Sequence, residues 1–166
     1  ERAREAFAED IEVALEVKSR YTEGYGELGL GRVLVDQGLP EDALEHLRTA
    51  RQRFEELNTP VEVSAASAFI GIVHLGLGDR ESALRSTSEA VKTLEAAGDV
   101  SGEYPPQQIW WLRYQVLKSA DPHQAPKKRG KGKTAKGDGR DSSPALGDQA
   151  WEALHRAHDI TLQGIA

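Results

Sequence analysis

Along most of the chain, apolar side chains recur every three or four positions and polar side chains fill the intervals. This spacing places the apolar residues on one face of a helix. No stretch alternates convincingly with a period of two, so no β-strand is expected. Gly, Pro and Asp separate the apolar segments and mark helix ends. We therefore predict an all-α chain, with helices over about residues 2–20, 23–37, 41–57, 60–77, 80–97, 106–119 and 148–164.

Part of the chain repeats with a period of 40 residues. Each copy reads as a helix, a glycine-containing turn and a second helix. Five small or apolar identities at one constant offset favour an internal repeat over chance. The first copy carries Gly31, Gly38, Ala43, Leu44 and Ala50, which recur as Gly71, Gly78, Ala83, Leu84 and Ala90.

The repeated small residues suit antiparallel helix pairs. We expect Gly31 and Ala43 where the two helices of a pair approach closely, because a larger side chain would force the axes apart. Gly38 and Gly78 stand where a left-handed residue would end the first helix of each copy.

Other residues mark where the following helices begin. Pro40 fits the first turn of a helix, and Asp79 is a good N-cap. The segment Thr59-Pro60-Val61-Glu62 has the spacing of a capping box, in which Thr59 and Glu62 would each bond a backbone N–H at the helix start.

The pattern Leu-Gly, then Gly, then Ala, with a further Ala seven residues on, resembles the tetratricopeptide repeat in its longer, 40-residue variety. It is similar to the repeat arrays of large bacterial regulators, where helical repeats adjoin ATPase, cyclase, sensor or DNA-binding modules. The resemblance covers about residues 22–162. It implies an all-α, right-handed superhelical solenoid of antiparallel helix pairs.

A third repeat departs from this pattern. Tyr114 takes the place of Gly31 and Gly71, and the matching alanine appears only at Ala150, after a long insertion. Because the chain lacks methionine and begins at Glu1, we expect it to be an excerpt from a longer protein. The expected organisation is one solenoid fragment over 1–166: a helix of a preceding repeat at 1–20, repeat 1 at 22–58, repeat 2 at 59–98, and repeat 3 at 105–166 with a basic insertion at 122–147.

The composition narrows the chemistry. Of 166 residues, 39% are hydrophobic and 29% charged, and there is no cysteine, so disulfides and thiolate nucleophiles are excluded. No apolar stretch approaches a membrane span and no signal-peptide pattern opens the chain, so we expect a cytoplasmic protein. No Gly-x-Ser-x-Gly or His-Glu-x-x-His motif is present. We expect no enzymatic activity, no cofactor and no metal.

Charge is distributed unevenly. Residues 122–147 carry seven basic and two acidic residues, which leaves 14 basic and 25 acidic residues, or −11, on the rest of the chain. The insertion is either a tolerated, solvated loop or an electrostatic contact for nucleic acid or an anionic surface, without aromatics for base stacking. Its candidate contact residues, within 127–140, are Lys127, Lys128, Arg129, Lys131, Lys133, Lys136 and Arg140.

Trp110 and Trp111 cannot both face one core, because adjacent helical residues point about 100° apart. We expect one of them to pack against Trp151 and Leu154 of the partner helix. The other is either partly exposed, as an interface anchor, or covered by a following repeat.

The tetratricopeptide resemblance implies a function and a site. It implies a protein–protein interaction scaffold in signalling or transcription regulation, whose partner is a protein, a peptide or another domain of the same parent chain. Nucleic-acid or anionic-surface contact through the basic loop, and a purely structural spacer, remain alternatives, and the oligomeric state is open. The family's groove positions fall on Tyr25, Leu28, Arg32, Asp36, Ala65, Ala68, Ile72, Leu75, Gln108, Trp111, Gln115 and Lys118.

Overall fold

The computed structural model describes residues 2–98, 102–120 and 146–163, and within these ranges every regular element is an α-helix. The all-α prediction is therefore confirmed, with helix ends within about four residues of those expected. The helices are α1 (Arg2–Glu16), α2 (Arg20–Asp36), α3 (Pro40–Glu56), α4 (Pro60–Gly76), α5 (Arg80–Ala97), α6 (Pro106–Ala120) and α7 (Leu146–Gln163).

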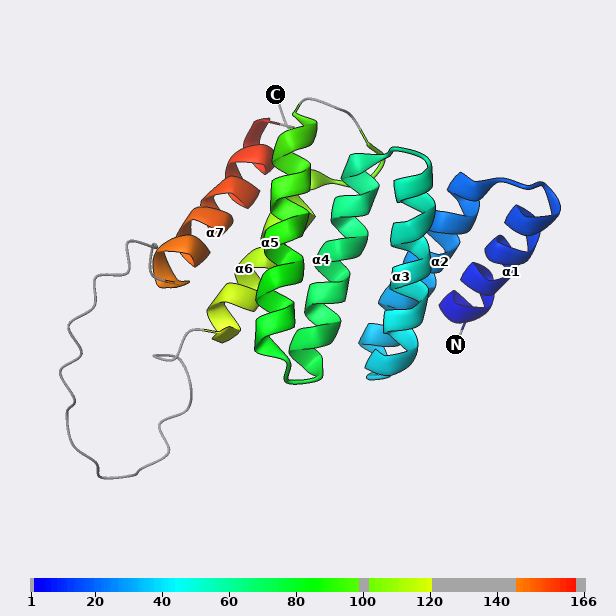
Figure 1. Ribbon diagram of the computed structural model, residues 1–166, viewed down its shortest axis with the longest axis horizontal. Coiled ribbons are helices and arrows are strands. Elements are labelled where there is room, and N and C mark those ends of the chain that lie inside the picture. Colours follow the sequence, from blue (N-terminus) through cyan, green and yellow to red (C-terminus); the bar gives the residue numbers. More distant parts are fainter. Residues whose placement is uncertain (1, 99–101, 121–145, 164–166) are drawn as a thin grey trace.

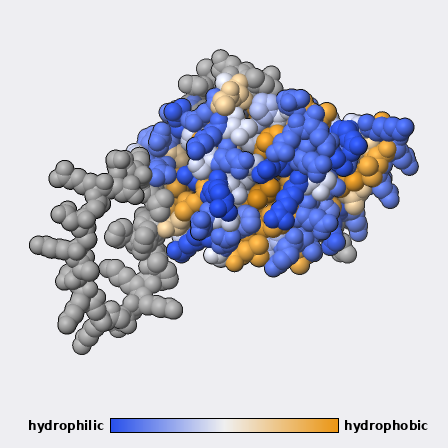
Figure 2. Space-filling model, viewed as in Figure 1, coloured by the Kyte–Doolittle hydropathy of each residue, from blue (hydrophilic) through white to orange (hydrophobic). Residues whose placement is uncertain are grey.

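Helices that are neighbours in sequence are also neighbours in space (Figure 1). α2 packs on α3, α4 on α5, and α6 on α7, while α1 packs on α2 at one end of the row. α4 also contacts both α2 and α6, so the first helices of the three pairs form one layer. The face drawn in Figure 2 is mostly hydrophilic, with apolar residues visible between the helices.

Helix ends recur every 20 residues. Lys18, Gly38, Asn58 and Gly78 have φ of 55°, 74°, 54° and 81° and each follows a helix, as Gly98 does at 62°. At each of the first four, the next residue donates its N–H to a carbonyl five residues earlier, which satisfies a carbonyl that the helix leaves unbonded. α1 ends at Glu16, four residues before the predicted end at residue 20, because the chain turns at Lys18, where no glycine marks the turn.

The helix starts are set partly by side chains. Asp79 is the N-cap of α5, and its carboxylate accepts a hydrogen bond from the Ser82 N–H at 3.0 Å. The predicted capping box at α4 is wrong. Thr59 makes no capping bond and instead donates its hydroxyl to the Phe54 carbonyl at 3.2 Å. Glu62 is engaged by tertiary partners, so its carboxylate does not turn back to the helix start.

The two repeat glycines lie in equivalent surroundings, as the repeat predicts. A Cβ added to Gly31 would lie 3.3 Å from the carbonyl oxygen of Ala43, and one added to Gly71 would lie 3.1 Å from that of Ala83. Both alanines are fully buried. Glycine therefore allows each helix of the first layer to lie close against its partner in the second.

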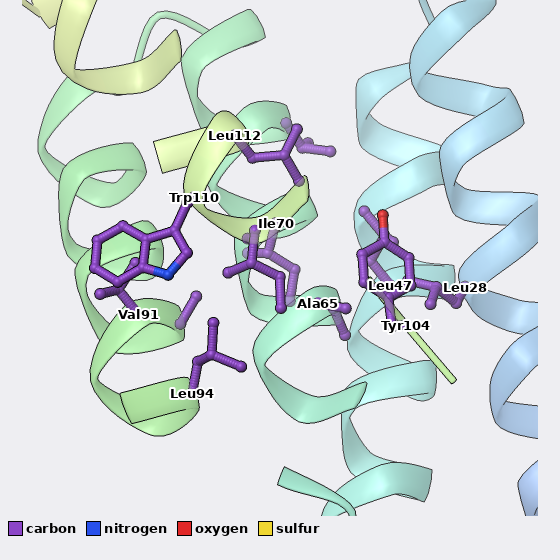
Figure 3. Packing of buried hydrophobic residues seen from close by; sticks show 14 of the residues in the cluster. Leu28, Leu47, Ala65, Ile70, Val91, Leu94, Tyr104, Trp110 and Leu112 are labelled. Atoms are coloured by element: carbon purple, nitrogen blue, oxygen red, sulfur yellow. The ribbon is translucent and has the colours of Figure 1, made fainter. Parts of the chain in front are cut away.

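The apolar core continues from pair to pair (Figure 3). Trp110 belongs to it, 7% exposed, with its indole ring turned toward Val91 of α5. Trp111, on the next position of α6, is 45% exposed, so the two tryptophans separate as predicted. The expected packing against Trp151 is wrong: that residue is 63% exposed, and its ring contact is with His155.

Candidate functional site

The twelve groove residues implied by the resemblance lie in the layer of α2, α4 and α6, but they differ in burial. Leu28 is 2% exposed, and Ala65 and Ala68 are fully buried, so these three belong to the core and present no side chain to a partner in this conformation. The exposed members are Arg32, Asp36, Gln108, Trp111 and Lys118. The partly buried members are Tyr25, Ile72, Leu75 and Gln115.

Arg32 links α2 to α4 and to the connection before α6. Its guanidinium carbon lies 5.1 Å from the ring centre of Phe69 and 5.9 Å from that of Tyr104. These two rings meet edge to face, with centroids 6.1 Å apart. Cation–π contacts of this kind hold a guanidinium in place while it stays at the surface. A fixed positive charge therefore lies beside two aromatic rings.

Tyr104 reaches this position because the segment 102–105 crosses α4. The carboxylate of Glu62, 2% exposed, accepts the Glu103 N–H at 2.9 Å and the Tyr25 hydroxyl at 3.0 Å. A Cβ on Gly102 would lie 2.7 Å from the same carboxylate, so only glycine lets the segment lie this close. The chain's own crossing segment thus covers part of the face that the resemblance assigned to a partner.

Burial shapes the chemistry of both tyrosines. Burial raises the pKa of the Tyr104 phenol, against a smaller opposing effect of the Arg32 charge. Burial also raises the pKa of Tyr25 well above its ordinary value, and the hydrogen bond with Tyr21 and the charge of Glu62 act in the same direction. Both phenols are therefore neutral hydrogen-bonding groups near neutral pH.

A second aromatic group lies along α6. The rings of Trp111 and Tyr114 are 5.2 Å apart and tilted by 32°. The Lys118 ammonium lies 5.7 Å from the ring centre of Tyr114. These residues are three and four positions apart, so they form a stripe on one side of the helix. Trp111 and Lys118 are exposed, and Tyr114 between them is partly buried.

Trp111 opens onto a hollow of about 330 Å³ between α6 and α7. On the α6 side, Gln108 joins the hollow to the first cluster, because its side-chain oxygen accepts the Tyr104 hydroxyl at 2.7 Å. The hollow is lined by Gln107, Gln108, Trp111, Leu154, Ala157 and His158. The Tyr104–Gln108 hydrogen bond, made by a tyrosine that is only 4% exposed, connects the two clusters, which together we call the aromatic face: Arg32, Phe69, Tyr104, Gln108, Trp111, Tyr114 and Lys118.

Sequence reasoning found four of these seven residues and missed Phe69, Tyr104 and Tyr114. Tyr104 lies between two predicted helices and was assigned to neither. Tyr114 replaces a repeat glycine and belongs, with the three tryptophans, to the main aromatic concentration of the sequence, but it is not among the predicted groove residues. An aromatic residue in a short linker beside two prolines is the one local signal that Tyr104 offered.

The basic residues at 127–140 lie outside the described ranges, so their role stays a prediction. Among the residues that the structure describes, no helix is long and apolar enough to cross a membrane. In the same ranges, no group of three or more His, Asp or Glu side chains is arranged to hold a metal ion. No protein-family model, curated protein or solved structure matches the chain.

Proposed function

We propose that this chain is a protein-binding scaffold and that the aromatic face is its partner-binding surface. The observation that carries the proposal is the exposure of Trp111 beside Tyr114, at the mouth of an open hollow. Tryptophan, tyrosine and arginine are the residues most enriched at binding hot spots, and this face contains all three. An exposed tryptophan, held on packed helices beside partly exposed rings, suits recognition of another protein.

We also propose a superhelical arrangement for the helix pairs. The equivalent surroundings of Gly31 and Gly71, and the helix ends spaced by 20 residues, support a right-handed superhelical solenoid of the tetratricopeptide type. In such an array each pair buries its face against the next. We further propose that the scaffold acts in the cytoplasm as a module of a larger signalling or transcription regulator.

The chemistry of the face indicates the class of partner. Positive charges on Arg32 and Lys118 lie at its two ends, with aromatic carbon between them. A complementary ligand is a peptide or helical segment with a short apolar stretch flanked by acidic residues. The apolar part would occupy the hollow beside Trp111, and the acids would face the cations.

A selection experiment tests this proposal. A phage-displayed random peptide library would be selected on the intact protein, and the enriched peptides then assayed on Trp111→Ala and on Trp151→Ala. Trp151 is a matched control, because it is more exposed than Trp111 but does not line the hollow. We expect acidic–apolar peptides whose binding is lost with Trp111→Ala alone. Peptides that bind both variants equally, or selection of no peptide, would refute the assignment.

A further inference from the structure

A second cavity lies between α5, α6 and α7, with a volume of about 220 Å³. In the first two helix pairs, Gly31 and Gly71 allow the two helices of the pair to pack closely against each other. α6 contains no glycine, and its bulky Trp110, Arg113 and Leu117 line the space toward α7 instead. A hollow in the equivalent place, between α3, α4 and α5, is lined by Arg51, Ile70 and Glu89, so what distinguishes the third pair is the large side chains that α6 contributes.

Arg113 is partly buried at this cavity and bonds only neutral acceptors. Its Nη1 donates to the Leu84 carbonyl at 2.8 Å and to the Thr87 hydroxyl at 2.9 Å. Its Nη2 donates to the Gln149 side-chain oxygen at 3.3 Å. Across residues 2–98, 102–120 and 146–163, no acidic side chain pairs with this guanidinium. Burial lowers its pKa, which reflects a cation without a counter-charge.

The guanidinium has donors left for a ligand. Of its five N–H groups, three are used, which leaves the Nε–H and one N–H of Nη2. Every fully buried side-chain nitrogen in the described residues has a hydrogen-bond partner. Because the Nε of Arg113 has none among them, it is accessible from the cavity. Nε and Nη2 form the edge of the fork that binds a carboxylate through two parallel hydrogen bonds.

The charged side chains at the rim of the cavity balance one another. Lys92 of α5 is exposed there, as are Glu95 of α5 and Glu152 of α7. With Arg113, these groups carry two positive and two negative charges. Because these charges balance, the rim adds little net attraction or repulsion, and an oxyanion gains chiefly the two parallel hydrogen bonds of the guanidinium fork, whose geometry matches a carboxylate. The small volume excludes a drug-sized ligand.

We propose that this cavity, the Arg113 pocket, binds a single carboxylate group, held side-on by Arg113. The carboxylate belongs either to a small free acid or to an acidic side chain of a peptide. The pocket is separate from the hollow beside Trp111, so the inference does not depend on the proposed function.

The three tryptophans provide a direct test by NMR. Trp110 lines the Arg113 pocket, Trp111 lines the hollow of the aromatic face, and Trp151 lines neither. Each indole N–H gives one signal, assigned with single Trp→Phe variants. The protein would be titrated with sodium acetate against sodium chloride at equal ionic strength. We expect a saturable shift of the Trp110 signal with acetate, and no such shift of Trp111 or Trp151.

Variants and further probes make the test specific. Arg113→Gln should weaken the acetate response at least tenfold, while Arg85→Gln, which removes an exposed guanidinium, should leave it unchanged. The capped peptide Ac-Ala-Glu-Ala-NH2 separates the two sources: a shift with acetate alone identifies a free acid, and a shift with both identifies a peptide side chain.

Three results would overturn the proposal. One is a Trp110 signal that responds no more to acetate than to chloride, which the parent protein alone can show even if Arg113→Gln does not fold. Another is an equal response in folded Arg113→Gln. The third is tighter binding of inorganic phosphate than of acetate. None of these results would bear on the peptide binding proposed for Trp111, because the two sites are monitored through the signals of different tryptophans.

Discussion

The buried carboxylate of Glu62 accepts a hydrogen bond from the backbone N–H of Glu103, 41 residues further along the chain, at 2.9 Å. This bond fixes the crossing segment 102–105 on α4. Tyr104 is thereby placed beside Arg32 and Phe69, which also contact each other. A tertiary contact of one glutamate therefore fixes the segment that brings Tyr104 into the aromatic face.

Replacing this glutamate should destabilise the protein measurably. Glu62→Ala leaves the part-buried Tyr25 hydroxyl and Glu103 N–H without their acceptor, and because water reaches part of both groups, the total loss is about 1–3 kcal/mol. We expect urea unfolding to show a loss in that range. Glu81→Ala, at a side chain 90% exposed, is the control and should change stability by less than about 0.5 kcal/mol. Equal midpoints for the two variants would show that the Glu62 bonds are not important for stability.

Tyr25 makes stability depend on pH in the alkaline range. Its folded-state pKa lies above the ordinary value of 10.0, so the folded protein holds the phenol proton more tightly than the unfolded chain does. This contribution is fully present below pH 10 and is lost as pH rises above that value, at up to about 1.4 kcal/mol per pH unit. Between pH 9 and 11, the free energy of unfolding should fall more steeply in the parent than in Tyr25→Phe. Parallel curves for the two proteins would contradict the assigned environment of Tyr25.

The close contact of the second helix pair predicts opposite effects at two glycines of α4. A Cβ at Gly71 meets Thr87 and the carbonyl of Ala83, so Gly71→Ala overpacks the pair and should cost about 1–3 kcal/mol. A Cβ at Gly76 meets nothing within 4 Å, so Gly76→Ala should be neutral or stabilising by up to about 1 kcal/mol. Thermal melts of both variants give the comparison. A stabilising Gly71→Ala would end the account of close helix approach.

Asn58, which follows α3 in a left-handed conformation, is a position where a substitution can raise stability. Asn58 has φ of 54°, a conformation that glycine adopts without strain. Asn58→Gly should therefore be neutral or stabilising by up to about 1 kcal/mol. Leu57→Gly, one position earlier at φ of −90°, should destabilise instead. Destabilisation of similar size in both variants would show that the helix end does not depend on the backbone conformation of Asn58.

The fold could be predicted largely because its signals are local. Gly38 and Gly78 end helices through their own conformation, and Gly31 and Gly71 recur at the repeat spacing. The turn at Asn58 has the same geometry but no glycine, so the 20-residue recurrence of helix ends could not be predicted from it.

The candidate site was harder to predict because its contacts are tertiary. Glu62 has the local spacing of a capping residue, yet partners from α2 and from the crossing segment engage its carboxylate. The resemblance implies groove positions for Leu28 and Ala65, but both are buried in the core. Which residues of a helical face stay exposed depends on what packs over them, and a segment far along the chain decides that here.

The central claim is that the aromatic face binds a protein partner through Trp111. The most direct measurement is the Kd of one selected acidic–apolar peptide, determined by calorimetry on the parent, Trp111→Ala and Trp151→Ala. A hot-spot residue contributes at least about 2 kcal/mol, so Trp111→Ala should raise Kd about 30-fold or more. Trp151→Ala should change it by less than about twofold, because its ring lies outside the hollow. A Kd unchanged by Trp111→Ala, or raised equally by both variants, would contradict the claim.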